Sequence, residues 1–310
     1  MTRYALHIGI NYANPHDFAD AQLDGAVHDA LTLNAFTNAL DFEAGSKQFA
    51  PSGALTDVDE NGQLTPIRPT AEHIFDAMTE AAGRLTADDL LFVSFSGLGP
   101  PPDFANPNAV ATRGLLCFDR LVLRFDDIVA ALSQAPGGKI VLVCACCFIG
   151  PRNTEGFRRT ARTLPARAVQ MASARKDSPT FADTAAKFDG LEKKRKAAAS
   201  SSDSGPIILH IAACALNEVI DDGTRTSNSP FVGELIKQLG VSTSRSFVEF
   251  IEALRSGLDP KPQFEFYLRG QQIQPGPSGL LAAAEAQFDD DILKEPADDF
   301  AGASVSQRKR

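Results

Sequence analysis

Four nearly continuous apolar runs constrain the fold of this chain more than any other feature. They cover 4–10, 90–96, 139–147 and 207–214. Runs of this length without polar alternation are typical of strands buried on both faces of a sheet. Between the runs, apolar residues recur every three or four positions, which is the spacing of an amphipathic helix. Helices are therefore predicted over 26–40, 71–85, 125–132, 230–239 and 247–254, with Thr70 as the N-cap of the second.

The alternation of strands and helices predicts an α/β fold. We expect a three-layer α/β/α sandwich with a mostly parallel sheet, and a last strand over 262–268. In sheets of this kind, functional groups lie at the carboxyl ends of the strands. Two such ends have unusual sequences, because Gly97-Leu98-Gly99 follows one run and Cys147-Phe148-Ile149-Gly150 follows another.

The composition excludes several classes of protein. Thirty Lys and Arg residues against 39 Asp and Glu give a net charge of −9, whereas a dedicated nucleic-acid binder would be basic. No apolar run approaches the ~18 residues of a membrane helix, and no signal peptide is evident. Five Cys residues, three of them at 144, 146 and 147, indicate reduced thiols rather than a disulfide scaffold. We expect a cytoplasmic protein without a nucleic-acid partner, a membrane partner or a cofactor.

The charge is unevenly distributed along the chain. Residues 151–205 contain twelve basic and six acidic residues, so this segment carries +6 and the rest of the chain −15. The segment is poor in large apolar residues, which predicts a mobile insertion. Residues 281–310 are acidic and end in a short basic cluster, which predicts a disordered tail. The expected organisation is one domain over 1–280 that contains the insertion.

The motifs of this chain, in their order, resemble the caspase/metacaspase superfamily of cysteine peptidases, in its bacterial metacaspase-like branch. The segment 95–99, Phe-Ser-Gly-Leu-Gly, lies where the family has Ser-Gly-His-Gly, and 145–150 lies where it has Asp-x-Cys-[His/Phe]-Ser-Gly. Further similarity is found at 5–12, 23–30, 55–57, 213–218, 229–231 and 262–263. The resemblance covers roughly 3–270 without the insertion, and implies the caspase-hemoglobinase fold.

In that family a Cys–His dyad cleaves peptide bonds. The thiol attacks the carbonyl carbon, the His transfers the protons, and two backbone N–H groups stabilise the oxyanion. The resemblance places Cys147 at the nucleophile position and Gly99 in the oxyanion hole. Leu98, which is 49 residues before Cys147, stands at the position of the His, for which a separation of about 50 is expected. Leu98 cannot transfer a proton.

Two further positions depart from the family pattern. Ala145 replaces the acidic residue that helps to hold a basic P1 side chain, and Ile149 replaces a small Ser. Asn217 and Glu218 follow a predicted strand, and from their position we expect them to edge the substrate pocket. Loss of a general base typically costs about 10²–10⁴-fold in rate. The departures favour a pseudoenzyme that binds a protein or peptide and acts by binding or regulation.

The alternative is an active Cys-dependent endopeptidase that cleaves proteins, with either a substitute base or a deliberately inactivated dyad. A single change at Leu98 would leave Ala145 and Ile149 unexplained. The candidate bases are His7, His16, His28, His73 and His210. Two of them lie in predicted strands, where a packed core position is expected, and two in predicted helices. His16, in the loop after the first run, is the least constrained.

Metal binding is not expected from the sequence. Cys146 and Cys147 are adjacent, and no second Cys pair stands at ligand spacing. Residues 57–62, Asp-Val-Asp-Glu-Asn-Gly, begin like a calcium-binding loop, but Arg68 stands where a bidentate Glu is needed and Pro66 interrupts the following helix. A polar turn is the better interpretation.

The insertion contains the basic run Lys193-Lys194-Arg195-Lys196. In the family that the chain resembles, proteolytic processing occurs in the segment after the Cys strand, and metacaspases cut after Arg or Lys. The resemblance therefore makes 151–205 a candidate processing region, and the alternative is a solvated loop without this role.

Overall fold

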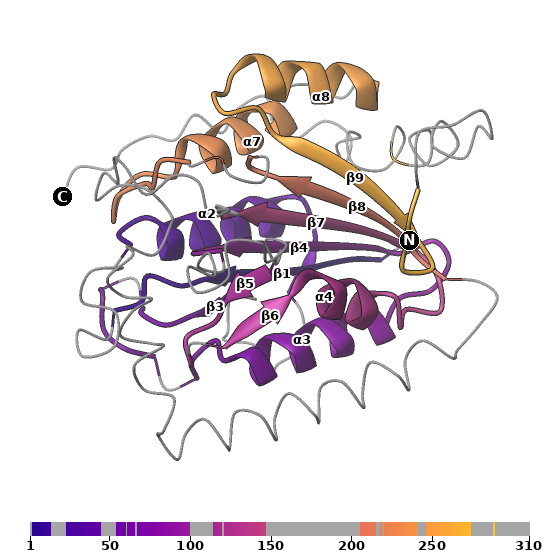
Figure 1. Ribbon diagram of the computed structural model, residues 1–310, viewed down its shortest axis with the longest axis horizontal. Helices are drawn as coiled ribbons and strands as arrows, with labels where there is room; N and C mark the ends of the chain where they lie inside the picture. Colours follow the sequence, from indigo (N-terminus) through magenta and orange to yellow (C-terminus); the bar gives the residue numbers. More distant parts are fainter. Residues whose placement is uncertain are drawn as a thin grey trace, which may run out of the picture.

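The computed structural model describes most of the domain predicted from the sequence. The described residues are 2–13, 23–44, 54–59, 61–65, 67–99, 114–119, 121–146, 205–214, 218, 220–240, 246–273 and 288. Their centre is an eight-stranded sheet in the order β10-β9-β8-β7-β4-β1-β2, with β3 also paired to β1 (Figure 1).

The long strands of the sheet are the four apolar runs and the predicted last strand. The strands are β1 (Arg3–Gly9), β2 (Glu43–Ala44), β3 (Ala54–Thr56), β4 (Leu90–Ser96), β7 (Lys139–Ala145), β8 (Ile207–Ala212), β9 (Gln263–Leu268) and β10 (Gln271–Gln272). All pairs from β2 to β8 are parallel, whereas β9 is antiparallel to both β8 and β10. A separate antiparallel pair joins β5 (Gly114–Leu116) to β6 (Val122–Arg124).

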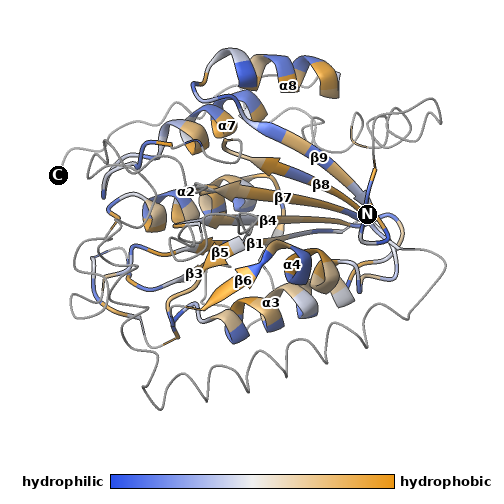
Figure 2. Cartoon of the chain, viewed as in Figure 1, coloured by the Kyte–Doolittle hydropathy of each residue, from blue (hydrophilic) through white to orange (hydrophobic). Residues whose placement is uncertain are grey.

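Helices cover both faces of the sheet (Figure 1). They are α2 (Ala26–Ala39), α3 (Ala71–Gly83), α4 (Phe125–Leu132), α7 (Pro230–Gly240) and α8 (Phe247–Ser256). One apolar cluster lies between the sheet and α3 and α4, and a second lies between the sheet and α7 and α8. In Figure 2, β7 and β8 are mainly hydrophobic, while α3 carries hydrophilic residues on the side away from the sheet. The predicted three-layer α/β/α fold is confirmed.

Local sequence signals set several helix ends. The Thr70 side chain accepts a hydrogen bond from the His73 N–H, which confirms the predicted cap of α3. Ser246 and Glu249 form a reciprocal capping box at the start of α8. None of the described helices is both long and apolar enough to span a membrane.

The strands that the sequence did not predict are β2, β3, β5, β6 and β10. Each has only two or three residues, which is too short for a hydrophobic period to appear. Two long strands end earlier than their apolar runs, since β7 stops at Ala145 and β8 at Ala212.

The insertion and the tail predicted from the sequence lie almost wholly outside the described residues. Of 151–205 only Gly205 is described, and of 281–310 only Phe288. Phe288 is fully buried, and its ring centroid lies 6.1 Å from that of Phe247 and 5.9 Å from that of Phe266. The apolar core between α8 and β9 therefore includes one residue beyond the domain boundary expected at 280.

Candidate functional site

The two motif-bearing strand ends lie side by side. Strands β4 and β7 are parallel neighbours, with Ser96 opposite Ala145, and the Gly97 N–H donates to the Ala145 carbonyl oxygen at 3.3 Å. The chain segments that follow these strands therefore leave the sheet at the same edge, as expected for functional groups in a parallel sheet. Leu98, Gly99 and Ala145 are described here, whereas Cys147, Ile149 and Asn217 lie outside the described residues.

Leu98 is part of the apolar core. Its side chain is fully buried in the cluster that also contains Tyr12 and Leu116. Its backbone is engaged as well, because its N–H donates to the Tyr12 hydroxyl at 2.9 Å and its carbonyl oxygen accepts from the Leu116 N–H at 3.0 Å. Both the side chain and the backbone of position 98 are thus held by the interior of the domain.

Tyr12 holds this segment from the end of β1. Its hydroxyl accepts from Leu98 and donates to the Leu116 carbonyl oxygen at 2.6 Å, so one phenol bridges two chain segments. Burial raises the pKa of Tyr12 well above its ordinary value, which keeps the hydroxyl proton in place. A Cβ at Gly97 would lie 3.0 Å from the hydroxyl oxygen and 2.7 Å from the Phe95 ring, so the close approach requires glycine.

Asp57 fixes the backbone around Tyr12. Its buried carboxylate accepts the N–H of Asn11 at 2.9 Å and the N–H of Ala13 at 3.0 Å. Tyr12, between them, has a φ of 56°, a backbone conformation that residues other than glycine rarely adopt. Burial raises the pKa of Asp57, while the backbone N–H groups oppose this rise. This role of Asp57 was not predicted from the sequence, where the residue was expected to begin a polar turn.

The polar turn itself follows Asp57. The Asp59 carboxylate accepts the N–H of Asn61 at 2.9 Å and of Gln63 at 2.8 Å, so the expected turn is confirmed. Within the described part of the chain, no group of three or more His, Cys, Asp and Glu side chains is placed to hold a metal ion.

A second buried carboxylate, Asp29, joins three elements. It accepts the Ser96 hydroxyl at 2.7 Å, the Ser229 N–H at 2.8 Å and the Ser229 hydroxyl at 2.7 Å. Asp29 lies on α2, Ser96 ends β4, and Ser229 precedes α7. The segment that carries Leu98 is therefore tied to the part of the chain that follows the insertion.

Asp222, from the part of the chain that follows the insertion, contacts the residues just before α2. Its carboxylate accepts the N–H groups of Asp24 and Gly25 at 2.8 and 3.1 Å, at the positive end of the α2 dipole. A Cβ at Gly25 would lie 2.4 Å from the Gly223 Cα, so the two backbones are in direct contact. Asp222 thus binds the backbone just before α2, whereas the N–H of Val27 in the first turn of the helix is accepted by the Asn11 carboxamide oxygen.

The histidines in the strands serve the core, as predicted. His7 is fully buried, with Nδ1 2.8 Å from the Ser94 hydroxyl and Nε2 2.9 Å from the Thr37 hydroxyl. Burial lowers the pKa of His7 to about 3, so its ring is neutral. His210 is also fully buried, and its Nδ1 lies 3.1 Å from a Glu265 carboxylate oxygen.

The strand register separates both rings from the candidate site. His7 lies opposite Ser94, and His210 opposite Leu142. Each partner is four residues before the strand end that carries Leu98 or Cys146, which corresponds to about 13 Å along a strand. His73, on α3, has Nδ1 2.7 Å from the Arg68 carbonyl oxygen. His16 lies outside the described residues.

The remaining site residues are placed as follows. Ala145 is buried and packs in one apolar cluster, while Cys144 and Cys146 pack in the other, so these neighbours face opposite sides of the sheet. The Glu218 residue is exposed, and its carbonyl oxygen accepts from the Cys214 thiol at 3.5 Å. The roles assigned to Ala145 and Glu218 in substrate binding stay predictions.

A mostly parallel sheet between two helical layers, with its motif-bearing ends at one edge, defines the class of α/β proteins to which the caspase fold belongs. The family model of the caspase domain matches residues 2–274. The chain therefore belongs to the caspase domain family, and it has the fold of a cysteine peptidase of that family.

The solved structures that are similar to this chain include the following two. The crystal structure of protein GSU0716 from Geobacter sulfurreducens is 21% identical, with a TM-score of 0.60, and the match covers 90% of this chain and 96% of that one. Caspase-1 from Spodoptera frugiperda is 10% identical, with a TM-score of 0.45, and the match covers 83% of this chain and 77% of that one. No curated protein sequence matches significantly. The similarity to the Geobacter protein supports the fold alone.

Proposed function

We propose that this chain is a caspase-domain protein without peptidase activity, which acts by binding a protein or peptide. The single observation that carries the proposal is the environment of Leu98. By the order of its motifs, the chain has Leu98 where the bacterial metacaspase-like branch has the His of the dyad. A leucine there removes the general base that would activate the thiol of Cys147.

The packing around Leu98 adds a second obstacle to catalysis, beyond the missing imidazole. The side chain is fully buried, and the backbone N–H is bound by Tyr12. A base that acts on a substrate must reach it within hydrogen-bond distance, directly or through one water. A side chain held in the core at position 98 does not meet this requirement.

Two other features support the proposal. Ala145, at the position of the acidic P1-binding residue, supplies a buried methyl group in place of a carboxylate. His7 has both ring nitrogens engaged by hydroxyl groups, and His210 has Nδ1 beside Glu265. Both rings lie in the core, opposite residues that precede the motif-bearing strand ends, which argues against either of them as a substitute base.

A protein partner is proposed from the substrates of the family and from the net charge of this chain. Caspase-domain proteins act on protein substrates, so the scaffold is suited to a polypeptide. The net charge of −9 supports a protein partner rather than a nucleic acid. The small and odd number of Cys residues supports a reducing compartment such as the cytoplasm.

A comparison of the parent protein with Cys147→Ala tests the proposal. Both are assayed with peptide substrates that end in Arg, Lys or Asp. We expect the same background rate from the two proteins, because the thiol has no base. Cleavage by the parent that Cys147→Ala abolishes would overturn the proposal in favour of an active endopeptidase.

A further inference from the structure

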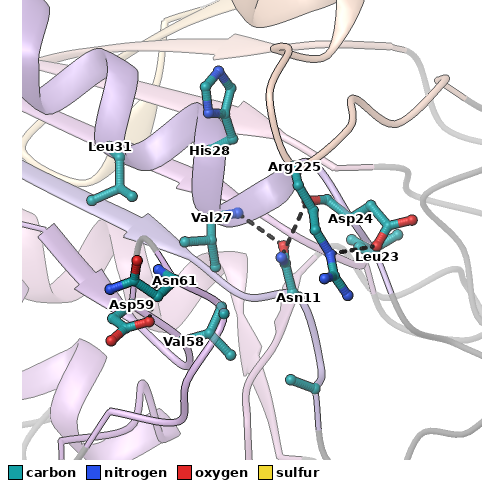
Figure 3. Close-up of a pocket in the computed structure, with 12 residues that line it drawn as sticks. Asn11, Leu23, Asp24, Val27, His28, Leu31, Val58, Asp59, Asn61 and Arg225 are labelled. Atoms are coloured by element: carbon teal, nitrogen blue, oxygen red, sulfur yellow. Dashed lines mark hydrogen bonds and ion pairs between the residues drawn. The ribbon is translucent and has the colours of Figure 1, made fainter. Parts of the chain in front are cut away.

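A pocket opens at the same end of the sheet as Leu98, beyond β1. It lies between the start of α2 and the turn that follows β3, and its volume is about 200 Å³ (Figure 3). One side is lined by Val27, His28 and Leu31 of α2, and the opposite side by Val58, Asp59, Asn61 and Gly62. The pocket is separate from Ala145, where the resemblance places the site for a P1 side chain.

The floor of the pocket is apolar and firmly held. Val27 and Leu31 are one helical turn apart, and they adjoin Leu23 and Val58. Leu23, Val27 and Val58 are buried, and Leu31 is half-buried. Such a floor offers contact to a chain of methylene groups, as the stem of a long basic side chain requires.

Asn11 fixes the base of the pocket. Its carboxamide oxygen accepts the Val27 N–H at 2.9 Å, and its carboxamide nitrogen donates to the Asp24 carbonyl oxygen at 3.2 Å (Figure 3). Both ends of the carboxamide thus hold the start of α2. The polar groups left to contact a ligand lie at the rim.

The rim has one neutralised and one unneutralised carboxylate. Asp24 lies 3.6 Å from the guanidinium of Arg225, and both side chains are exposed. Asp59 is on the other side, and the hydrogen bonds it makes with the described residues come from the N–H groups of Asn61 and Gln63. Among the described residues, no cation is paired with Asp59.

We propose that this pocket binds a Lys or Arg side chain of a protein partner. The methylene groups lie on the floor formed by Val27, Leu31 and Val58, and the cationic group contacts Asp59. The charge of the chain outside 151–205, which is −15, favours the approach of a basic partner. The protein nature of the occupant rests on the proposed function, whereas recognition of the cation rests on the pocket itself.

The test uses small probes with the full chain. Nα-acetyl-lysine methylamide is titrated while the backbone amide resonances are recorded by nuclear magnetic resonance. Nα-acetyl-norleucine methylamide, which has a similar stem without the charge, is the matched probe. We expect saturable shifts at Val27, Leu31, Asn61 and Gly62 with the lysine probe, and clearly weaker binding of the norleucine probe.

Two variants locate the cation. Asp59→Asn should weaken binding of the lysine probe about fivefold, the factor that an exposed ion pair contributes. Asp88→Asn removes an exposed carboxylate that is not part of the pocket, and it should bind the probe as the parent does. Both variants change the net charge equally, so any difference between them reports on the pocket.

Three results would each overturn the assignment: no saturable shift, equal binding of the two probes, or equal effects of the two variants. A failed titration would leave the proposed loss of peptidase activity untouched. Conversely, Cys147-dependent cleavage would overturn the proposed function while a positive titration would still establish the pocket.

Discussion

The carboxyl ends of β4 and of β1 and β3 belong to one edge of the same sheet, yet they are built in opposite ways. At the end of β4, Leu98 is fully buried and both of its backbone polar groups are hydrogen-bonded. At the end of β3, Asp59 and Asn61 are exposed at the rim of a pocket. In this chain, the position at which the resemblance places the family's general base is closed, and a neighbouring place at the same edge is open.

The two regions share one buried carboxylate. Asp57 ends the short strand next to the pocket, and it holds the backbone of 11–13. That backbone places the Tyr12 hydroxyl on Leu98. The segment 11–13 therefore supports both the closed region around Leu98 and the pocket. The burial of Leu98 is compatible with an open pocket beside it.

The largest expected effect is that of Leu98→Ala. It should lower the free energy of unfolding by about 2–5 kcal/mol, because it leaves a cavity in a packed core. Asp59→Ala should lower it by only about 0.5–1.5 kcal/mol, because it removes hydrogen bonds in an exposed turn and leaves no cavity. Urea denaturation of both variants measures the difference. If Leu98→Ala lowered the free energy of unfolding as little as Asp59→Ala, the stated difference between the closed and the open region would be wrong.

The buried imidazole of His7, in the core below the closed region, should appear in the pH dependence of stability. The pKa of His7 is about 3 in the folded protein, and the ordinary value is 6.5. Between these values the unfolded chain binds the proton and the folded protein does not, so stability falls as the pH falls. From pH 6 to pH 4 this group should cost about 2.5 kcal/mol.

His7→Gln removes the titrating group and keeps a polar side chain. The free energy of unfolding of this variant should therefore depend less steeply on pH than that of the parent over the same range. Chemical denaturation at a series of pH values gives both curves. Parallel curves would contradict the account of a buried neutral ring.

Tyr12→Phe should have the next largest effect, about 1–3 kcal/mol. It removes only the hydroxyl, which leaves the buried Leu98 N–H and the Leu116 carbonyl without this partner. Tyr4→Phe, at a half-buried position, is the matched control and should change stability by less than about 0.5 kcal/mol. If the two variants were equally stable, Tyr12 would not hold the closed region.

The contact beside the pocket should have the smallest effect. Asp222→Ala removes the two hydrogen bonds that its carboxylate accepts from Asp24 and Gly25, and should cost about 0.5–1.5 kcal/mol. Its neighbour Asp221 is exposed, so Asp221→Ala is a matched change of charge. Thermal unfolding of the two variants compares them. A larger loss of stability from Asp221→Ala than from Asp222→Ala would show that net charge, and not the hydrogen bonds of Asp222, decides the stability of this region.

The sequence predicted the layers of the fold because they depend on local patterns. The bounds of β4 and α4 agree with their apolar runs, and the Thr70 cap needs only the three residues that follow it. The short strands β2 and β3 escaped prediction, since two or three residues take their partner from tertiary structure.

The carboxylates of the site could not be predicted for a similar reason. Asp29, Asp57 and Asp222 bind partners that are 67, 46 and 198 residues away, and no local pattern encodes such pairs. The resemblance to the family singled out positions 98 and 147 as those of the dyad. It could not predict that the Leu98 side chain is enclosed by the core. The roles of Cys147, Gly99 and Asn217 stay predictions.

Hydrogen exchange in the native state tests most directly whether position 98 belongs to the core. The amides of Leu98 and Leu116 should exchange only through global unfolding, with free energies equal to that of the whole domain. The amides of Asn61 and Gln63, in the exposed turn, should exchange through local opening. Exchange of Leu98 at a free energy close to that of Asn61 would show that the β4 end opens on its own, and would contradict the account.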